Sequence, residues 1–259
     1  MALNATKNQK EHKSKRFIEL DMLRGLAIIL MIFAHILWDL DYFGVVPINS
    51  IIFSSLQSFV PHMFFFIVGV CLIINVKKKN LRMEKERKYF KHLAFRGLKI
   101  ICIGIGLSIL SLIFIPKTPV FFGVLHCIGL SIILSIPFLK FRRHNVLFAF
   151  VLLFIGFLFS QVIIENPNML HLILGLRPAN IWNFTVDYFP IFPWFGFVVL
   201  GISVGDILYS RNERRFRFPN IEEYKPAKLF SWFGRHSLGL YLIHQPIITG
   251  FLYLFIRTF

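Results

Sequence analysis

Long apolar runs separated by short polar stretches dominate this chain. A helix that crosses the hydrocarbon core of a bilayer needs about 20 consecutive, mostly apolar residues. Runs of that kind predict helices near residues 22–40, 56–76, 96–115, 120–139, 146–164, 190–209 and 237–256. The pattern therefore predicts an all-α fold, a polytopic transmembrane bundle of about seven helices.

The basic residues fall almost entirely in alternate loops of this pattern. Of the 29 Lys and Arg residues, 26 lie in the N-terminal segment and first helix start, the 77–99 and 211–235 loops, and the 140–143 turn. Cytoplasmic loops of membrane proteins carry an excess of Lys and Arg. The N-terminus is therefore predicted to be cytoplasmic, and an odd number of helices places the C-terminus on the other side.

The composition supports a membrane protein and argues against a nucleic-acid partner. Hydrophobic residues make up 56% of the 259-residue chain and charged residues only 16%, whereas soluble domains are about 45–50% apolar. The net charge of +16 is explained by topology, so no nucleic-acid binding is expected. We expect residues 1–16 to be a disordered basic tail and residues 17–259 a single transmembrane domain in the plasma membrane.

Four histidines lie inside the predicted membrane helices, namely His35, His62, His126 and His244. Ionisable side chains are costly there and usually face the bundle interior or a water-filled cavity. His35, His62 and His126 are each expected a turn or two below the outer surface, so they are predicted to surround one cavity. All four are candidate catalytic residues. No metal site is predicted, because the three cysteines show no CxxC pairing.

The first predicted helix carries three polar residues on or near one face. Arg24 and His35 are eleven residues apart, which is about 16 Å along a helix. Asp39 follows His35 by four residues and is within reach of the imidazole, where a carboxylate fixes the tautomer and raises basicity. The alternative for Arg24 is a topology signal that pairs with Asp21.

Several segments together resemble a known family. They are RFIELDMLRGLAIILMIFAHILWDLDYFG (16–44), VPHMFFFIVGVCL (60–72), GVLHCIGLSI (123–132), DYFPIFPWFGFVVLGI (187–202) and GRHSLGLYLIHQPII (234–248). They resemble the heparan-alpha-glucosaminide N-acetyltransferase-like membrane proteins, which are related to membrane acyltransferase family 3. The resemblance covers nearly the whole chain from residue 16.

This resemblance implies an enzyme that uses cytoplasmic acetyl-CoA or another acyl-CoA to acylate a glycan or amino-sugar acceptor on the far side of the membrane. His35 matches the catalytic histidine and Arg24 the arginine near the coenzyme. Arg96 is similar to cationic positions that face the coenzyme phosphates, and Lys99 and Arg235 are further candidates for coenzyme binding. His35 either deprotonates the acceptor or accepts the acyl group itself.

Two other functions are compatible with histidines in membrane helices. A small proton-coupled transporter uses His and Asp relays, although the chain shows no inverted repeat. A b-type cytochrome ligates haem through pairs of histidines on neighbouring helices. Acyl-CoA turnover that depends on His35 would separate an enzyme from a carrier, and a Soret band would identify a cytochrome.

Overall fold

The computed structural model describes residues 16–45, 50–79, 83–210 and 213–258. Within these ranges the chain is mostly helical, and strand-like pairing is limited to isolated bridges such as that between Phe122 and Tyr188. The all-α prediction is confirmed. The predicted tail at residues 1–16 lies almost wholly outside the described residues.

Each of the seven predicted membrane helices has a counterpart. They are α2 (Ile18–Tyr42), α3 (Ser50–Lys79), α4 (Met83–Phe114), α5 (Val124–Phe141), α6 (Asn145–Gln161), α8 (Ile191–Leu208) and α10 (Ser237–Thr258). The main difference is at α4, which begins 13 residues before the apolar run because its Lys-, Glu- and Arg-rich start consists of good helix formers.

Five stretches are long and apolar enough to cross a membrane. They are Ile18–Asp41, Phe53–Lys78, Arg87–Phe114, Val124–Gln161 and Ile191–Leu208. The fourth contains both α5 and α6, which are joined by the short 3-10 turn η1 (Arg142–His144). Ser237–Leu252 in α10 is a shorter apolar helix.

Three short helices lie in segments where the hydropathy pattern predicts none. They are α7 (Met169–Leu174), η2 (Ile181–Asn183) and α9 (Lys225–Arg235). A capping box starts α7: Asn168 accepts the His171 amide hydrogen at 2.9 Å, and the His171 ring accepts that of Asn168 at 3.3 Å. Helices this short leave no long apolar run in the sequence.

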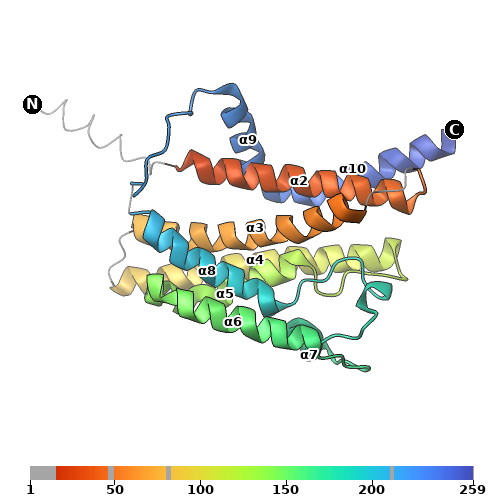
Figure 1. The fold of residues 1–259 in the computed structure, drawn as a ribbon, viewed down its shortest axis with the longest axis horizontal. Helices are drawn as coiled ribbons and strands as arrows, with labels where there is room; N and C mark the ends of the chain where they lie inside the picture. The colour runs from red at the N-terminus through yellow and green to blue at the C-terminus, as the bar shows by residue number, and fades with distance from the viewer. Residues whose placement is uncertain (1–15, 46–49, 80–82, 211–212, 259) are drawn as a thin grey trace, which may run out of the picture. The chain divides into compact units, whose positions relative to one another are not determined.

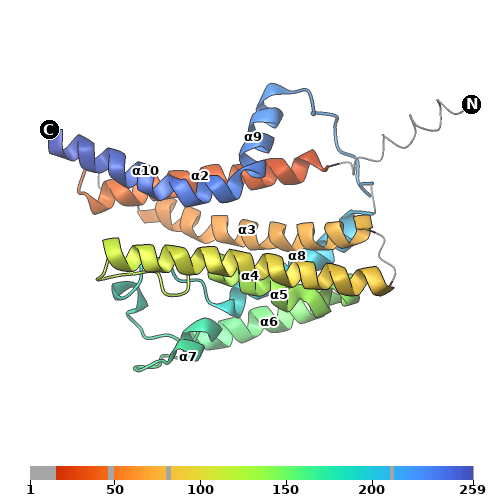
Figure 2. The same ribbon diagram turned by 180° about the vertical axis from the view of Figure 1, so that it is seen from behind.

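The chain forms two compact units, the first containing residues up to Ile67 and from Arg217 onward, the second Val68–Phe216. The boundary falls within α3. That residues 17–259 act as one transmembrane domain stays a prediction. In the first unit, α10 runs alongside α2 and α9 lies against α2 near its N-terminal end (Figures 1 and 2).

In the second unit, α5 packs between α4 and α8, and α6 also packs against α8 (Figure 1). Small residues allow close approach of these helices. A Cβ on Gly69 of α3 would lie 1.9 Å from the Val198 carbonyl oxygen of α8. A Cβ on Gly97 of α4 would lie 2.6 Å from the Gly129 carbonyl oxygen of α5.

Candidate functional site

Helices α2 and α10 bring together two of the predicted catalytic histidines. The ring centroids of His35 and His244 are 4.8 Å apart, with the rings tilted by 60°. His244 is buried and His35 is half-buried. These two imidazoles, which come from opposite ends of the sequence, therefore form one site inside the first unit.

This pair does not have the geometry of two axial haem ligands. Such ligands hold a metal between them, with metal–imidazole bonds of about 2 Å on each side. Two such bonds plus the distance from each nitrogen to its ring centre exceed the 4.8 Å that separates the centroids. The cytochrome alternative gains no support from these two histidines.

The alignment of α2 with α10 is set by a close crossing between α2 and α9. A Cβ on Gly25 would lie 1.8 Å from the Phe230 carbonyl oxygen, and a Cβ on Gly234 would lie 1.8 Å from the Asp21 carbonyl oxygen. Only glycine permits this approach at either position. His35 and His244 each follow one of these glycines by ten residues, and α10 runs alongside α2, so the two histidines meet.

Asp39 is anchored to α10 rather than to His35. Its buried carboxylate, 1 % exposed, accepts hydrogen bonds from Gln245 Nε2 at 3.0 and 3.1 Å and from the Thr249 hydroxyl at 3.5 Å. Among the described contacts, none joins it to the His35 ring. This differs from the expectation that Asp39 orients His35, because the carboxylate turns toward the amide of the neighbouring helix.

The sequence analysis did not single out Gln245 and Thr249. Both are polar residues in an apolar helix, and they are four residues apart, which places them on the same face of α10. That signal could have identified them as a pair with a buried partner. It could not have identified the partner as Asp39, which is 206 residues from Gln245 in sequence.

The hydrogen bond of His244 to its own helix defines its ring tautomer. Nδ1 lies 2.6 Å from the Tyr241 carbonyl oxygen, which can only accept, so Nδ1 carries the hydrogen. The other nitrogen, Nε2, is buried and has no hydrogen-bond partner within the described part of the chain. The same is true of Gln245 Oε1. Two acceptor atoms in adjacent residues are therefore left unsatisfied in this site.

The two remaining candidate histidines have other surroundings. The His62 ring hydrogen bonds through Nδ1 to the Ser58 carbonyl oxygen of its own helix. His126 belongs to the second unit, where it is buried beside the Phe122 ring at 5.6 Å and against Gly104. A common cavity of His35, His62 and His126 stays a prediction.

The candidate coenzyme-binding cations occur in both units. In the first unit, Arg24 forms an ion pair with Asp21 at 3.3 Å, and Arg235 is exposed at the end of α9. These two arginines directly adjoin the crossing glycines, Gly25 and Gly234. In the second unit, Arg96 and Lys99 are exposed on α4. The ion pair of Arg24 with Asp21 is the contact expected if Arg24 serves only to mark the cytoplasmic side of the membrane. The Arg24 guanidinium is half-buried at the crossing of α2 and α9.

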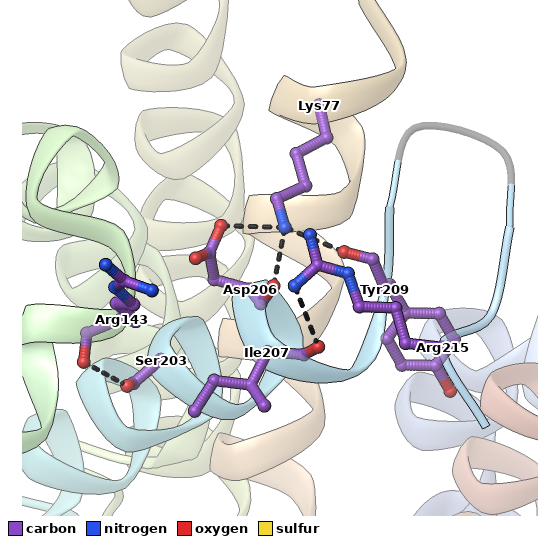
Figure 3. A network of polar contacts seen from close by, with 7 residues as sticks. All are labelled: Lys77, Arg143, Ser203, Asp206, Ile207, Tyr209 and Arg215. Carbon is purple, nitrogen blue, oxygen red and sulfur yellow. Dashed lines mark hydrogen bonds and ion pairs between the residues drawn. The ribbon is translucent and has the colours of Figure 1, made fainter.

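A further polar network lies in the second unit and was not predicted (Figure 3). The Lys77 ammonium contacts the Asp206 carboxylate and donates to the carbonyl oxygens of Asp206 and Tyr209, each at 2.7 Å. A cation at the C-terminal end of a helix satisfies free carbonyl groups and the negative end of the helix dipole. Lys77 therefore holds the end of α3 to the end of α8, which is a structural role.

Asp187 lies in the loop before α8 and caps α5. Its carboxylate accepts the backbone N–H of Val124, the first residue of α5, at 3.2 Å. Burial raises the pKa of the Asp187 carboxyl to about 6, although this hydrogen bond acts in the opposite direction. A carboxylate at a helix N-terminus is a favourable arrangement. No local pattern in the sequence indicates this contact, which spans 63 residues.

The long apolar helices and the polar cluster between two of them define a polytopic integral membrane protein with a buried histidine site. The chain belongs to the family of the heparan-alpha-glucosaminide N-acetyltransferase catalytic domain, whose model matches residues 16–246. The resemblance predicted from the sequence is thereby confirmed, and the family is of the membrane acetyltransferase type. Neither curated proteins nor solved structures give a significant match to this chain.

Proposed function

We propose that this protein is a membrane acyltransferase that moves an acyl group, most simply acetyl, from cytoplasmic acyl-CoA to a hydroxyl or amine of a sugar-type acceptor outside the plasma membrane. The observation that carries the proposal is the pairing of His35 with His244, 4.8 Å apart, between two apolar helices. Placing an ionisable imidazole in a membrane helix is energetically costly, so such residues usually belong to a functional site. Family membership supports transferase chemistry rather than transport.

The coenzyme would bind at the crossing of α2 and α9. Arg24 and Arg235 adjoin Gly25 and Gly234 there, and a guanidinium binds phosphate through a planar fork of donors. The eleven residues from Arg24 to His35 correspond to about 16 Å of helix. If the arginines held the coenzyme phosphates, the linear acyl-bearing arm of the coenzyme would extend along α2 toward the histidines. Arg96 and Lys99 on α4 are the other candidates for phosphate binding.

At the other end, His35 would act on the reacting atoms. Its ring is half-buried beside the His244 ring, and the nitrogen that carries no hydrogen in a neutral imidazole can act as a base or a nucleophile. Asp39 would hold α10, and thereby His244, beside His35 through its hydrogen bonds to Gln245. His62 and His126 stay catalytic candidates from the sequence alone.

The test is acyl transfer by the full-length protein purified into lipid nanodiscs. Acetyl-CoA labelled in the acetyl group is supplied with a panel of sugars and amino sugars, and both free thiol and labelled product are measured. We expect His35→Ala to reduce transfer at least about 100-fold, the usual scale of acid–base catalysis, with an unchanged melting temperature.

His236→Ala is the matched control. His236 is an exposed histidine of the same unit whose ring hydrogen bonds to the Trp232 carbonyl oxygen at 2.9 Å, and it lies outside the proposed site. This variant should keep wild-type turnover. Normal transfer by His35→Ala would refute the assigned site, and the absence of any acyl-CoA turnover by wild-type protein would favour the transporter alternative.

A further inference from the structure

We propose that His244, Gln245 and Asp39 bind the acyl acceptor, that this acceptor is recognised as a donor of O–H or N–H hydrogen bonds, and that His244 takes its proton. This inference rests on the proposed acyltransferase function and adds to it the residues that recognise the acceptor and the identity of the base. It is carried by two unsatisfied acceptor atoms, Nε2 of His244, whose ring lies beside that of His35, and Oε1 of the adjacent Gln245.

The backbone of α10 fixes His244 as a base. Because Nδ1–H donates to the Tyr241 carbonyl oxygen at 2.6 Å, the neutral ring must carry its lone pair on Nε2. This is the same division of labour as in a catalytic triad, where the partner of one ring nitrogen sets the tautomer and leaves the other nitrogen to accept a proton. Here a backbone carbonyl takes the place of the carboxylate that the sequence suggested.

The Asp39 carboxylate fixes the orientation of the neighbouring amide. Gln245 Nε2 lies 3.0 and 3.1 Å from the two carboxylate oxygens and 3.3 Å from the Thr249 hydroxyl. The reversed amide would place an oxygen against a carboxylate, so the NH2 group must face Asp39. Gln245 Oε1 is thereby directed away from Asp39, and it is buried without a donor.

The site therefore offers acceptors and needs donors. His244 Nε2 and Gln245 Oε1 are both acceptors without partners, and the nearby Asp39 carboxylate adds a third acceptor group. Buried polar atoms without partners are rare, and each calls for an explanation. A polyol or an amino sugar supplies several O–H or N–H groups and would satisfy them. A phosphate or a carboxylate would be repelled, so the coenzyme phosphates do not belong here.

The chemical step balances with these groups. The acceptor O–H or N–H gives its proton to His244 Nε2, and its oxygen or nitrogen forms a bond to the carbonyl carbon of the thioester. The C–S bond breaks, the sulfur leaves with its electron pair, and the resulting thiolate takes the proton back from His244. No oxidant, reductant or metal is required. His35, whose ring centroid lies 4.8 Å from that of His244, would then contact the thioester rather than act as the base.

The tautomer is tested first, by a measurement that does not depend on activity. The full chain, labelled with ¹⁵N-histidine and reconstituted in bilayers, is studied by solid-state NMR, and the His244 signals are identified by their loss in His244→Gln. We expect a neutral ring with its hydrogen on Nδ1. A ring with its hydrogen on Nε2 would overturn the assignment of the base, whether or not the protein is an acyltransferase.

The role of His244 is tested next by kinetics with acetyl-CoA and the preferred acceptor. His244→Gln places an amide near the position of Nε2, so it can hydrogen bond but cannot accept a proton. We expect kcat to fall at least about 100-fold, while the KM for the acceptor changes less than about threefold and acetyl-CoA binding is unchanged. The control His236→Gln makes the same replacement outside the site and should retain wild-type kcat.

The acceptor-binding role is tested by the double variant Asp39→Leu with Gln245→Leu. Replacing both partners leaves no orphaned carboxylate, so this variant is expected to fold. The KM for the acceptor should rise at least about tenfold, with acetyl-CoA affinity unchanged. An unchanged acceptor KM, or normal kcat in His244→Gln, would refute this inference alone. If wild-type protein turns over no acyl-CoA, the proposed function fails, and the NMR result still decides the tautomer.

Discussion

Gly25 and Gly234 bring the backbones of α2 and α9 into direct contact, because a Cβ on either residue would lie 1.8 Å from a carbonyl oxygen of the other helix. At this point the two backbones are separated only by the Cα hydrogens of the glycines. The crossing sets the position of α10, which follows α9 directly, and with it the pairing of His244 with His35.

Gly234→Ala should therefore destabilise the protein by about 3 kcal/mol or more, at the upper end of the range for overpacking, because the obstacle is backbone rather than a movable side chain. Thermal unfolding in nanodiscs measures this effect. Gly250→Ala is the matched control: it lies in α10 of the same unit, and a Cβ there meets nothing within 4 Å. That control should be neutral or slightly stabilising, by up to about 1 kcal/mol, because Ala is the better helix former. Equal melting temperatures for the two variants would contradict the crossing.

The helices of this fold were predictable from the sequence because membrane helices are marked by length and hydropathy alone. Helix α9 was not, because a short helix with Lys225, Lys228 and Arg235 reads as a polar loop. The residues that it buries are the small ones, Ala227, Ser231 and Gly234, so a search for long apolar runs does not detect it. The same limit applies to α7, whose start depends on a local capping box.

The candidate site was predictable only in part. His35 and His244 stand out as polar residues in apolar helices, and both lie within the range that the family model matches. Their contact depends on helix packing across some two hundred residues of sequence, which no local pattern specifies. For the same reason, Asp39 was expected to contact His35, which lies four residues away in the same helix. Its observed partner, Gln245, lies on another helix and could not be inferred from local spacing.

The pairing of Asp187 with the start of α5 predicts a pH dependence of stability. The pKa of this carboxyl is about 6 in the folded protein and about 3.9 in an unfolded chain. The folded state therefore binds the proton more tightly, so this group's contribution to stability is most favourable below about pH 4 and is lost as the pH rises from about 4 to 6. The expected loss is on the order of 3 kcal/mol.

Asp187→Asn should remove this dependence and still accept the Val124 amide hydrogen. Melting temperatures measured between pH 4 and 7 should then change less with pH than those of the wild type, and the variant should be the more stable protein at pH 7. Glu165→Gln, at an exposed carboxylate in the same loop region, removes the same charge and serves as control. Parallel pH profiles for wild type and Asp187→Asn would show that the cap does not titrate in this range.

The distribution of the basic residues predicts which loops face the cytoplasm. In a variant without Cys71, Cys102 and Cys127, single cysteines at the exposed positions Lys88 and Asn166 should differ in labelling. A membrane-impermeant thiol reagent added to intact cells should label Asn166→Cys, and Lys88→Cys should react only after the membrane is opened. Labelling of both positions in intact cells would overturn the predicted orientation and the cytoplasmic position of the coenzyme site.

The arginines beside the glycine crossing give the sharpest test of the coenzyme site. Acyl-CoA carries several negative charges on its phosphates, and a charge-assisted Arg–phosphate contact is roughly twice as strong as a neutral hydrogen bond. Loss of one such contact near water should cost about 1.5–3 kcal/mol, or about ten- to a hundredfold in affinity. Arg24→Ala and Arg235→Ala should each weaken acetyl-CoA binding by that factor, as measured by calorimetric titration in nanodiscs.

Lysine at position 24 separates phosphate binding from a purely structural role. If Arg24 binds phosphate, Arg24→Lys should recover only part of the affinity, because an ammonium cannot form the two-pronged contact. If Arg24 serves only its ion pair with Asp21 at 3.3 Å, lysine should replace it fully and affinity should not change in Arg24→Ala. Arg217→Ala is the control. Arg217 is exposed, is predicted to lie on the same side of the membrane, and is not adjacent in sequence to either crossing glycine. Unchanged affinity in both Arg24→Ala and Arg235→Ala would move the donor site away from α2 and α9, and Arg96 and Lys99 on α4 would become the residues to test.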